Sequence, residues 1–334
     1  MKLNIARQPL IPALLTLAAI TALTMWKAPA PTACTAENLS IPTFGELAIP
    51  SVEELLCRFQ AANPVWAKWI AGFLTLFTGL ILGRLTLRYN LYSAGTCLAI
   101  PLFGIFVAGL LTGSDGLSTL TATTLLALAV RNYSRSFCNG YGFDAIFRAS
   151  FYLGLMTLAA PSSLPLVGML LLAVVLFHRT LREAVVAIAG MLLPILTFCY
   201  VNWGAGGDFL TPFTLASDAF LHGSPLDAVR SIPLKHLVAL VAILLLDLAA
   251  LVYFLGDSYA TGNKPRAIFI FQIGLLVLLV PTMLNPVSTT ADLTFMAVPS
   301  AVIVPFLLVR IHRLPNLILY LLLLGGSVAI LFLQ

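Results

Sequence analysis

The chain has 334 residues, of which 60% are hydrophobic and 9% are charged, and its mean hydropathy is +1.01. A soluble domain needs many more charged side chains on its surface, so this composition excludes one and predicts a polytopic membrane protein. The net charge of +5 comes without a basic stripe that carries interleaved aromatic residues, so we expect no nucleic-acid partner.

Apolar runs close to membrane-spanning length recur along the whole chain, which predicts an all-α transmembrane bundle that forms a single domain over 1–334. We expect about eleven spans of roughly 20 residues or slightly fewer. In chain order they are 8–26, 66–83, 91–111, 116–131, 143–160, 163–178, 184–203, 236–255, 267–284, 293–309 and 314–333. Gly79 and Gly83 in the second span form a G-x-x-x-G pair, which favours close packing against another helix.

The first predicted span has two competing interpretations. Lys2 and Arg7 precede an apolar run, and the small residues of 28–33 follow it, as in a cleaved signal peptide. The run from Pro9 to Trp26 is long for a signal peptide, so the sequence favours an uncleaved helix and leaves cleavage as the alternative.

Lys and Arg are distributed unevenly among the connections, and they favour the cytoplasmic side of membrane proteins. With the N-terminus inside, thirteen basic residues lie inside and five outside, which predicts an N-inside, C-outside topology. The inside set is Lys2, Arg7, Arg84, Arg88, Arg131, Arg135, Arg148, Arg179, Arg182, Lys264, Arg266, Arg310 and Arg313. The outside set is Lys27, Arg58, Lys68, Arg230 and Lys235.

Residues 131–148 form an arginine-rich inside stretch. Arg131 and Arg135 either only mark the cytoplasmic side or bind a phosphate or lipid headgroup, because the guanidinium group suits bidentate contact with phosphate. Asp144 and Arg148 are four residues apart at the start of a predicted helix, so we expect them to pair on its face.

The first predicted outer segment, 27–65, contains an amphipathic helix at 51–60. Ser51 and Glu54 have the spacing of a capping box, and four apolar residues then fall on one helical face: Val52, Leu55, Leu56 and Phe59. The helix either lies on the outer surface of the membrane or forms an acidic lid in which Glu53 or Glu54 is a general base.

Two of the five cysteines, Cys34 and Cys57, lie in this outer segment, on the oxidising side of the predicted topology. A disulfide between them would close a loop of about 23 residues. The alternative is two free thiols. No C-x-x-C spacing occurs, so the cysteines predict no metal site.

The second predicted outer segment, 204–235, holds the largest group of titratable residues outside: Asp208, Asp218, His222, Asp227, Arg230 and Lys235. In one interpretation Asp208 is a catalytic base and Arg230 or Lys235 binds phosphate. In the other it is a solvated loop. The spacings match no metal-ligand motif, so no metal is predicted.

Asp247 is the single acidic residue in the middle of a predicted span. An intramembrane carboxylate costs a few kcal/mol and usually faces the bundle interior or a cavity. It is either protonated and hydrogen-bonded to a Ser, Thr or backbone carbonyl, or it is the proton-coupling site of a transporter.

The spans 143–160 and 163–178 are joined by the uncharged sequence PSSLP at 161–165. Both runs approach spanning length, so two full spans are expected, with a re-entrant hairpin as the alternative.

Four features follow one another in order: FRASFYLGL at 147–155, Pro161, FHRTLRE at 177–183 and GMLLP at 190–194. Over about 130–205 this order resembles an uncharacterised multi-spanning inner-membrane protein family of Bacteroidota. The resemblance implies an inner-membrane location in a Gram-negative cell, and it implies no activity.

Three functions remain open. The favoured one is a non-enzymatic subunit or scaffold in cell-envelope biogenesis, and the alternatives are a glycosyltransferase that uses a polyprenyl-phosphate sugar and a transporter built around Asp247. The expected partners are the lipid bilayer, a polyprenyl-phosphate lipid or other membrane subunits. The sequence contains no P-loop or G-x-G-x-x-G motif, so no cofactor is predicted.

Overall fold

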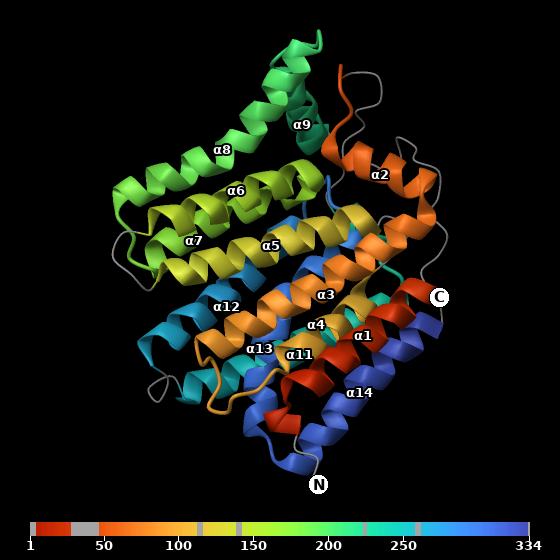
Figure 1. The fold of residues 1–334 in the computed structure, drawn as a ribbon, viewed down its shortest axis with the longest axis vertical. Helices are drawn as coiled ribbons and strands as arrows, with labels where there is room; N and C mark the ends of the chain where they lie inside the picture. Colours follow the sequence, from red (N-terminus) through yellow and green to blue (C-terminus); the bar gives the residue numbers. More distant parts are fainter. Residues whose placement is uncertain are drawn as a thin grey trace.

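The computed structural model describes residues 5–27, 47–111, 116–137, 142–222, 226–257 and 262–332, and within these ranges it contains helices and no strand (Figure 1). In chain order the helices are η1 (Ile5–Arg7), α1 (Leu10–Lys27), α2 (Val52–Ala62), α3 (Pro64–Arg88), α4 (Ala99–Leu110), α5 (Gly116–Ser136), α6 (Phe143–Ala159), η3 (Pro161–Val167), α7 (Gly168–Leu176), α8 (Leu181–Gly204), α9 (Thr211–His222), α10 (Asp227–Arg230), α11 (Leu234–Asp257), α12 (Asn263–Met283), η4 (Thr290–Met296), α13 (Ala297–Arg310) and α14 (Arg313–Phe332).

Seven segments in the described ranges are long and apolar enough to cross a membrane: α1, α3, α8, α11, α12, η4 with α13, and α14. These seven helices give the chain the architecture of an integral membrane protein. The other predicted spans also form helices, but α4 has 12 residues and α6 has 17, which is short for a span. Length and composition thus support seven spans directly, and the count of eleven stays a prediction.

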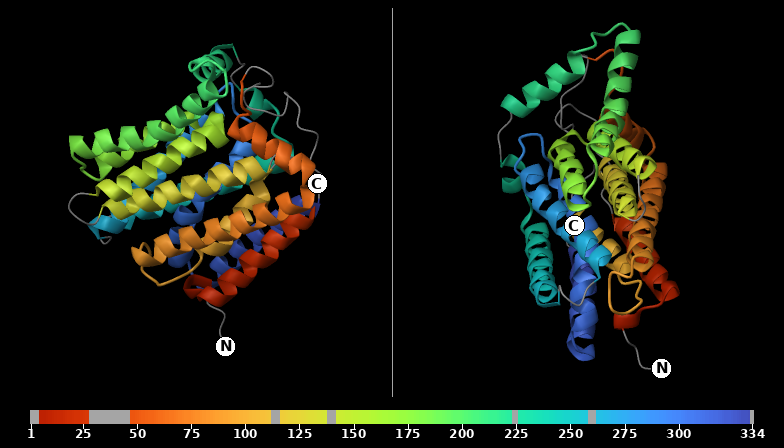
Figure 2. Two further views of the ribbon diagram at one scale, coloured as in Figure 1. Left: turned by 45° about the horizontal axis from the view of Figure 1, so that its top comes forward. Right: turned by 90° about the vertical axis from the view of Figure 1, so that its left-hand side faces the viewer.

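Successive long helices run in opposite directions, so the bundle has two ends (Figures 1 and 2). At one end α3, α5, α7, α11 and α13 finish and α6, α8, α12 and α14 begin. We call it the arginine end, because it holds the basic residues near these termini, among them Arg88, Arg135, Arg182, Lys264 and Arg313. Lys264 lies over the Tyr89 ring at 4.9 Å, which joins the start of α12 to the end of α3. We call the opposite end, where α2 and α9 lie, the α9 end.

The centre of the bundle is formed by α4 and by η4 with α13. Every residue of α4 is buried, and so is 94% of the apolar window of Thr290–Arg310. In α8, α11 and α14 the buried share is 22%, so these helices form the periphery. Three rings fill the space between α11, α12 and α13: Phe254 stacks on Phe269 at 4.2 Å, and Phe306 lies 5.0 Å from Phe269.

The G-x-x-x-G pair of α3 lies at close helix contacts, as predicted. A Cβ atom at Gly79 would lie 2.7 Å from Leu17 of α1, and one at Gly83 would collide with Ile100 of α4. The absence of a side chain at both positions allows α3 to approach its two neighbours.

The segment α6–η3–α7 traverses the bundle twice. The Ser118 hydroxyl at the start of α5 donates to the carbonyl of Ala159 at 2.6 Å, so α6 reaches the α9 end. Phe177 follows α7 and packs on Phe137, which follows α5, with ring centroids 5.5 Å apart. Both helices therefore extend between the two ends of the bundle, and the choice between two full spans and a re-entrant hairpin stays a prediction. The predicted Asp144–Arg148 pair is confirmed, at 2.8 Å.

Candidate functional site

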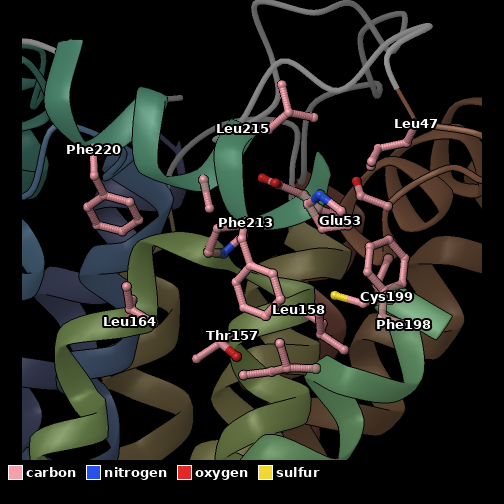
Figure 3. Close-up of a pocket in the computed structure, with 16 residues that line it drawn as sticks. Leu47, Glu53, Thr157, Leu158, Leu164, Phe198, Cys199, Phe213, Leu215 and Phe220 are labelled. Atoms are coloured by element: carbon pink, nitrogen blue, oxygen red, sulfur yellow. The ribbon is translucent and has the colours of Figure 1, made fainter. Parts of the chain in front are cut away.

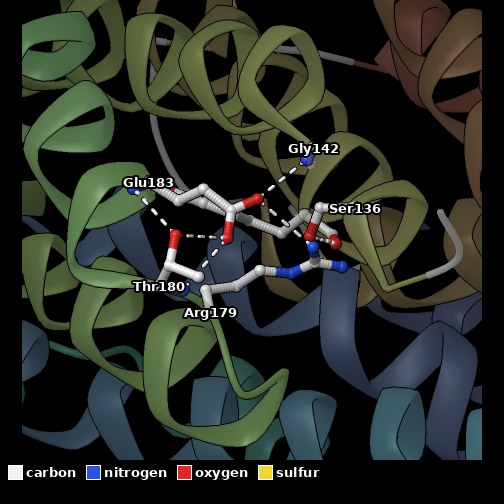
Figure 4. Close-up of polar contacts among 6 residues, drawn as sticks. Ser136, Gly142, Arg179, Thr180 and Glu183 are labelled. Carbon is white, nitrogen blue, oxygen red and sulfur yellow. Dashed lines mark hydrogen bonds and ion pairs between the residues drawn. The ribbon is translucent and has the colours of Figure 1, made fainter. Parts of the chain in front are cut away.

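The start of α8 is fixed by a buried carboxylate, Glu183 (Figure 4). The Thr180 side chain caps the helix, and Glu183 accepts hydrogen bonds from the backbone N–H of Thr180 at 3.0 Å and of Gly142 at 2.7 Å. Arg179 pairs with the same carboxylate at 3.3 Å. The Arg-Glu turn of the family resemblance therefore joins α8 to the turn before α6, which is a structural role.

Two glycines let α6 and α8 cross at close range. A Cβ atom at Gly154 would collide with the carbonyl oxygen of Met191 and lie 2.6 Å from Pro194. A Cβ atom at Gly190 would lie 2.9 Å from the carbonyl oxygen of Phe147. These residues belong to the motif segments at 147–155 and 190–194, so helix packing accounts for them.

About one turn beyond this crossing, towards the α9 end, the two helices line a cavity of about 200 Å³ (Figure 3). We call it the α9 pocket. Its lining includes Thr157 and Leu158 of α6, Pro161 and Leu164 of η3, Ile195, Phe198 and Cys199 of α8, Phe213, Ala216 and Phe220 of α9, and Val52 and Glu53 of α2.

The lining is apolar except for a few groups, chiefly Ser51, Glu53, Thr157 and Cys199. Glu53 is only 8% exposed, and Figure 3 shows the Phe213 ring extending towards Thr157, with Glu53 farther from Thr157. Apolar walls with few polar groups are typical of sites that bury the apolar part of a ligand and orient it by a polar contact.

Asn202, near the end of α8, joins the two predicted outer segments. Its side chain is fully buried. The Ala48 N–H donates to its amide oxygen at 3.0 Å, and its amide nitrogen donates to the carbonyl of Asp208 at 2.9 Å. The first outer segment is thereby held against the turn that leads into α9, and α2 is held over the pocket.

The structure separates the three candidate bases. Glu53 lines the α9 pocket. Glu54 is buried and forms an ion pair with Arg58 on α2. The Asp208 side chain is exposed and is not part of the lining. Of the three, Glu53 is the residue placed to meet a ligand.

The helix that carries these glutamates has the expected N-cap but a different buried face. Ser51 accepts from the N–H of Glu54 at 3.1 Å. Leu56 and Phe59 pack against the core, whereas Leu55 is 55% exposed and both Glu53 and Glu54 are buried. Pocket formation and the ion pair to Arg58 explain the buried acids, and neither could be seen from helical periodicity.

The four candidate phosphate-binding cations lie in two separate places. Arg131 and Arg135 are near the end of α5 at the arginine end, where Arg131 is close enough to Arg84 and Arg88 for their like charges to act on it. Arg230 ends α10 and Lys235 is the second residue of α11, and neither lines the α9 pocket.

Asp247 is buried in α11 and faces α13. The Ser300 hydroxyl donates to its Oδ2 atom at 2.6 Å. Within the described residues Oδ1 is buried and has no hydrogen-bond partner. The contact with Ser300 corresponds to the structural alternative for Asp247, so the transporter role is supported only by the buried carboxylate itself.

The disulfide between Cys34 and Cys57 stays a prediction. Cys57 is half-buried on α2, and Cys34 lies outside the described residues.

The sequence predicted a solvated loop or a catalytic segment at 204–235, and it did not predict α9 or the walls of the pocket. The segment 204–235 contains α9 and α10. A signal for α9 was present, because Pro212 suits a first helical turn and Phe213, Ala216 and Phe220 recur at helical spacing. No local pattern could show that α9 covers the space between α6 and α8.

No protein-family model matches the chain, and no curated protein matches it. The resemblance to a Bacteroidota family therefore stays a prediction.

Proposed function

We propose that this integral membrane protein binds the apolar chain of a membrane lipid in the α9 pocket, as a non-enzymatic subunit of cell-envelope biogenesis. The observation that carries the proposal is the pocket itself, with walls from α2, η3, α6, α8 and α9 and an almost wholly apolar lining. Water in such a cavity finds few polar partners, whereas each buried CH₂ group of a lipid chain contributes about 0.8 kcal/mol.

The pocket is also placed where a lipid can reach it. Leu164 and Phe213 line it and remain 44% and 41% exposed, so its apolar surface continues to the outside of the bundle. The walls on α8 belong to a helix of which only 22% is buried, as expected for a helix that faces lipid.

The topology of the proposal is the one predicted from the sequence, with eleven spans, the N-terminus inside and the C-terminus outside. The gathering of the predicted inside cations at the arginine end supports it, because basic residues favour the cytoplasmic side. The α9 pocket would then open at the outer leaflet of the inner membrane of a Gram-negative cell.

A transferase that uses a polyprenyl-phosphate sugar is the second candidate, favoured by the Glu53 carboxylate in the pocket wall. In the described part of the chain no basic side chain lines the pocket beside Glu53 to hold a phosphate. For this reason we place lipid binding without catalysis first.

Photo-crosslinking tests the lipid site. The full chain is placed in nanodiscs that contain a phospholipid with a diazirine in its acyl chain, and crosslinked peptides are mapped by mass spectrometry. We expect labelling around Phe198 and Phe213, its loss in Ala216→Trp, which fills the pocket, and its retention in the control Ser217→Trp. Ser217 is the exposed neighbour on α9. Equal labelling of both variants would overturn the lipid site.

Deletion of the gene, followed by profiling of lipid-linked and protein-linked glycans, separates the two candidates. Unchanged glycans would exclude the transferase. Altered glycans that Glu53→Gln fails to restore, while the wild type restores them, would place the transferase first.

A further inference from the structure

A second cavity, of about 370 Å³, lies at the arginine end and is lined by parts of three separate segments. Arg7 comes from η1, Ser93 from the connection between α3 and α4, and Arg310 and Arg313 from the junction of α13 and α14. We propose that this cavity binds the phosphate group of an anionic ligand. It lies at the opposite end of the bundle from the α9 pocket, so the proposal is independent of the lipid site there.

The charges of the lining are only partly compensated. Arg310 forms an ion pair with Asp257 at the end of α11, and its guanidinium lies over the Phe306 ring at 4.7 Å. These contacts hold Arg310 in place. In the described part of the chain neither Arg7 nor Arg313 forms an ion pair, so two guanidinium groups at the cavity lack an anion.

Arginine is the side chain best suited to this task, because its planar donors match the oxygen atoms of a phosphate. The neighbouring groups add to the same preference. The Ser93 hydroxyl can donate a hydrogen bond. α14 begins at Arg313, so the first backbone N–H groups of this helix and the positive end of its dipole also lie at the cavity.

A preference of basic residues for the cytoplasmic side would explain arginines at this end of the bundle, but it would not explain why several of them line one cavity. Arg148 and Arg182 lie at the same end of the bundle and are exposed, but neither lines the cavity. Arg7 and Arg313 are more than 300 residues apart in the sequence, and the fold places both beside one hollow. A phosphate group could come from an anionic lipid headgroup or from a soluble phosphate, and both would use the same donors.

The test measures binding to the full chain in nonionic detergent, with three probes: dioctanoyl phosphatidylglycerol, dioctanoyl phosphatidylcholine and inorganic phosphate. The cavity variant is the double substitution Arg7→Gln and Arg313→Gln. The control is Arg148→Gln and Arg182→Gln, which removes the same charge from the same end. All four side chains are exposed, so we expect both variants to fold, and thermal unfolding verifies it.

We expect the cavity variant to bind dioctanoyl phosphatidylglycerol or inorganic phosphate about a hundredfold more weakly than the wild type. The reason is that each charged hydrogen-bonding contact is worth about tenfold or more in affinity. The control should change affinity by less than about threefold, as distant exposed charges do. Selective loss of phosphatidylglycerol binding identifies a lipid headgroup, and selective loss of inorganic phosphate binding identifies a soluble ligand. Equal losses in both variants, or no binding of any probe to the wild type, would overturn the proposal.

Discussion

The α6–α8 pair behaves differently along its length. Between the arginine end and Pro194, Gly154 and Gly190 allow the two helices into contact, and Glu183 fixes the start of α8. About one turn past Pro194 the same helices present Leu158 and Phe198 to a cavity. We call the part of the pair before Pro194 the closed half, because two glycines and one buried carboxylate hold the helices in contact there. We call the part that lines the α9 pocket the hollow half, because large side chains keep the helices apart there and α9 covers the space between them.

The largest expected effect on stability comes from removing the Glu183 carboxylate, which fixes the start of α8 in the closed half. Glu183→Ala removes the carboxylate that pairs with Arg179 and accepts from the partly buried Gly142 N–H, so we expect a loss of about 3 kcal/mol in the free energy of unfolding. Chemical unfolding of the purified protein in detergent measures it. Glu183→Gln, which keeps an acceptor, should lose less, and equal losses in the two variants would show that the negative charge accounts for the whole effect and the acceptor for none of it.

Adding bulk at the crossing should be nearly as damaging. Gly154→Leu places carbon atoms where the Met191 carbonyl and Pro194 lie, so we expect about 3 kcal/mol of destabilisation and a lower Tm. The matched control is Gly256→Leu, because a Cβ atom there would have no neighbour within 4 Å. Similar Tm values for the two variants would show that α6 and α8 are not in close contact.

A smaller effect on stability is expected from a change in α2, which lies over the α9 pocket. Ser51→Ala removes the side chain that caps α2, which should cost about 1 kcal/mol. Thermal unfolding measures it, and Ser51→Asp should restore the cap. No change in either variant would mean that α2 does not contribute to the stability of the bundle.

The smallest effect on stability is expected from bulk added in the hollow half. Ala216→Leu extends a side chain into empty space, so the free energy of unfolding should change by less than about 1 kcal/mol, in contrast to Gly154→Leu. A destabilisation as large as that of Gly154→Leu would show that the pocket has no room for a ligand.

The sequence predicted what depends on local patterns. Apolar run lengths gave the helical membrane architecture, and spacing alone identified the Gly79–Gly83 contacts and the Asp144–Arg148 pair. The α9 pocket depends on segments that are far apart in the chain and on the bonds of Asn202, for which no local pattern exists. For the same reason periodicity could not show that Glu53 enters a pocket while Leu55 stays exposed.

The hydrogen bond from Ala48 to Asn202 spans 154 residues of sequence, which has a consequence for the order of biosynthesis. At translation rates of 5–20 residues per second, the ribosome needs on the order of 10–30 s to supply Asn202 after Ala48. During this interval α2 has left the ribosome without the helix end that anchors it. Since α9 is made later still, it is the last wall of the pocket to be synthesised, and nascent α6 and α8 face the surrounding lipids before the pocket closes.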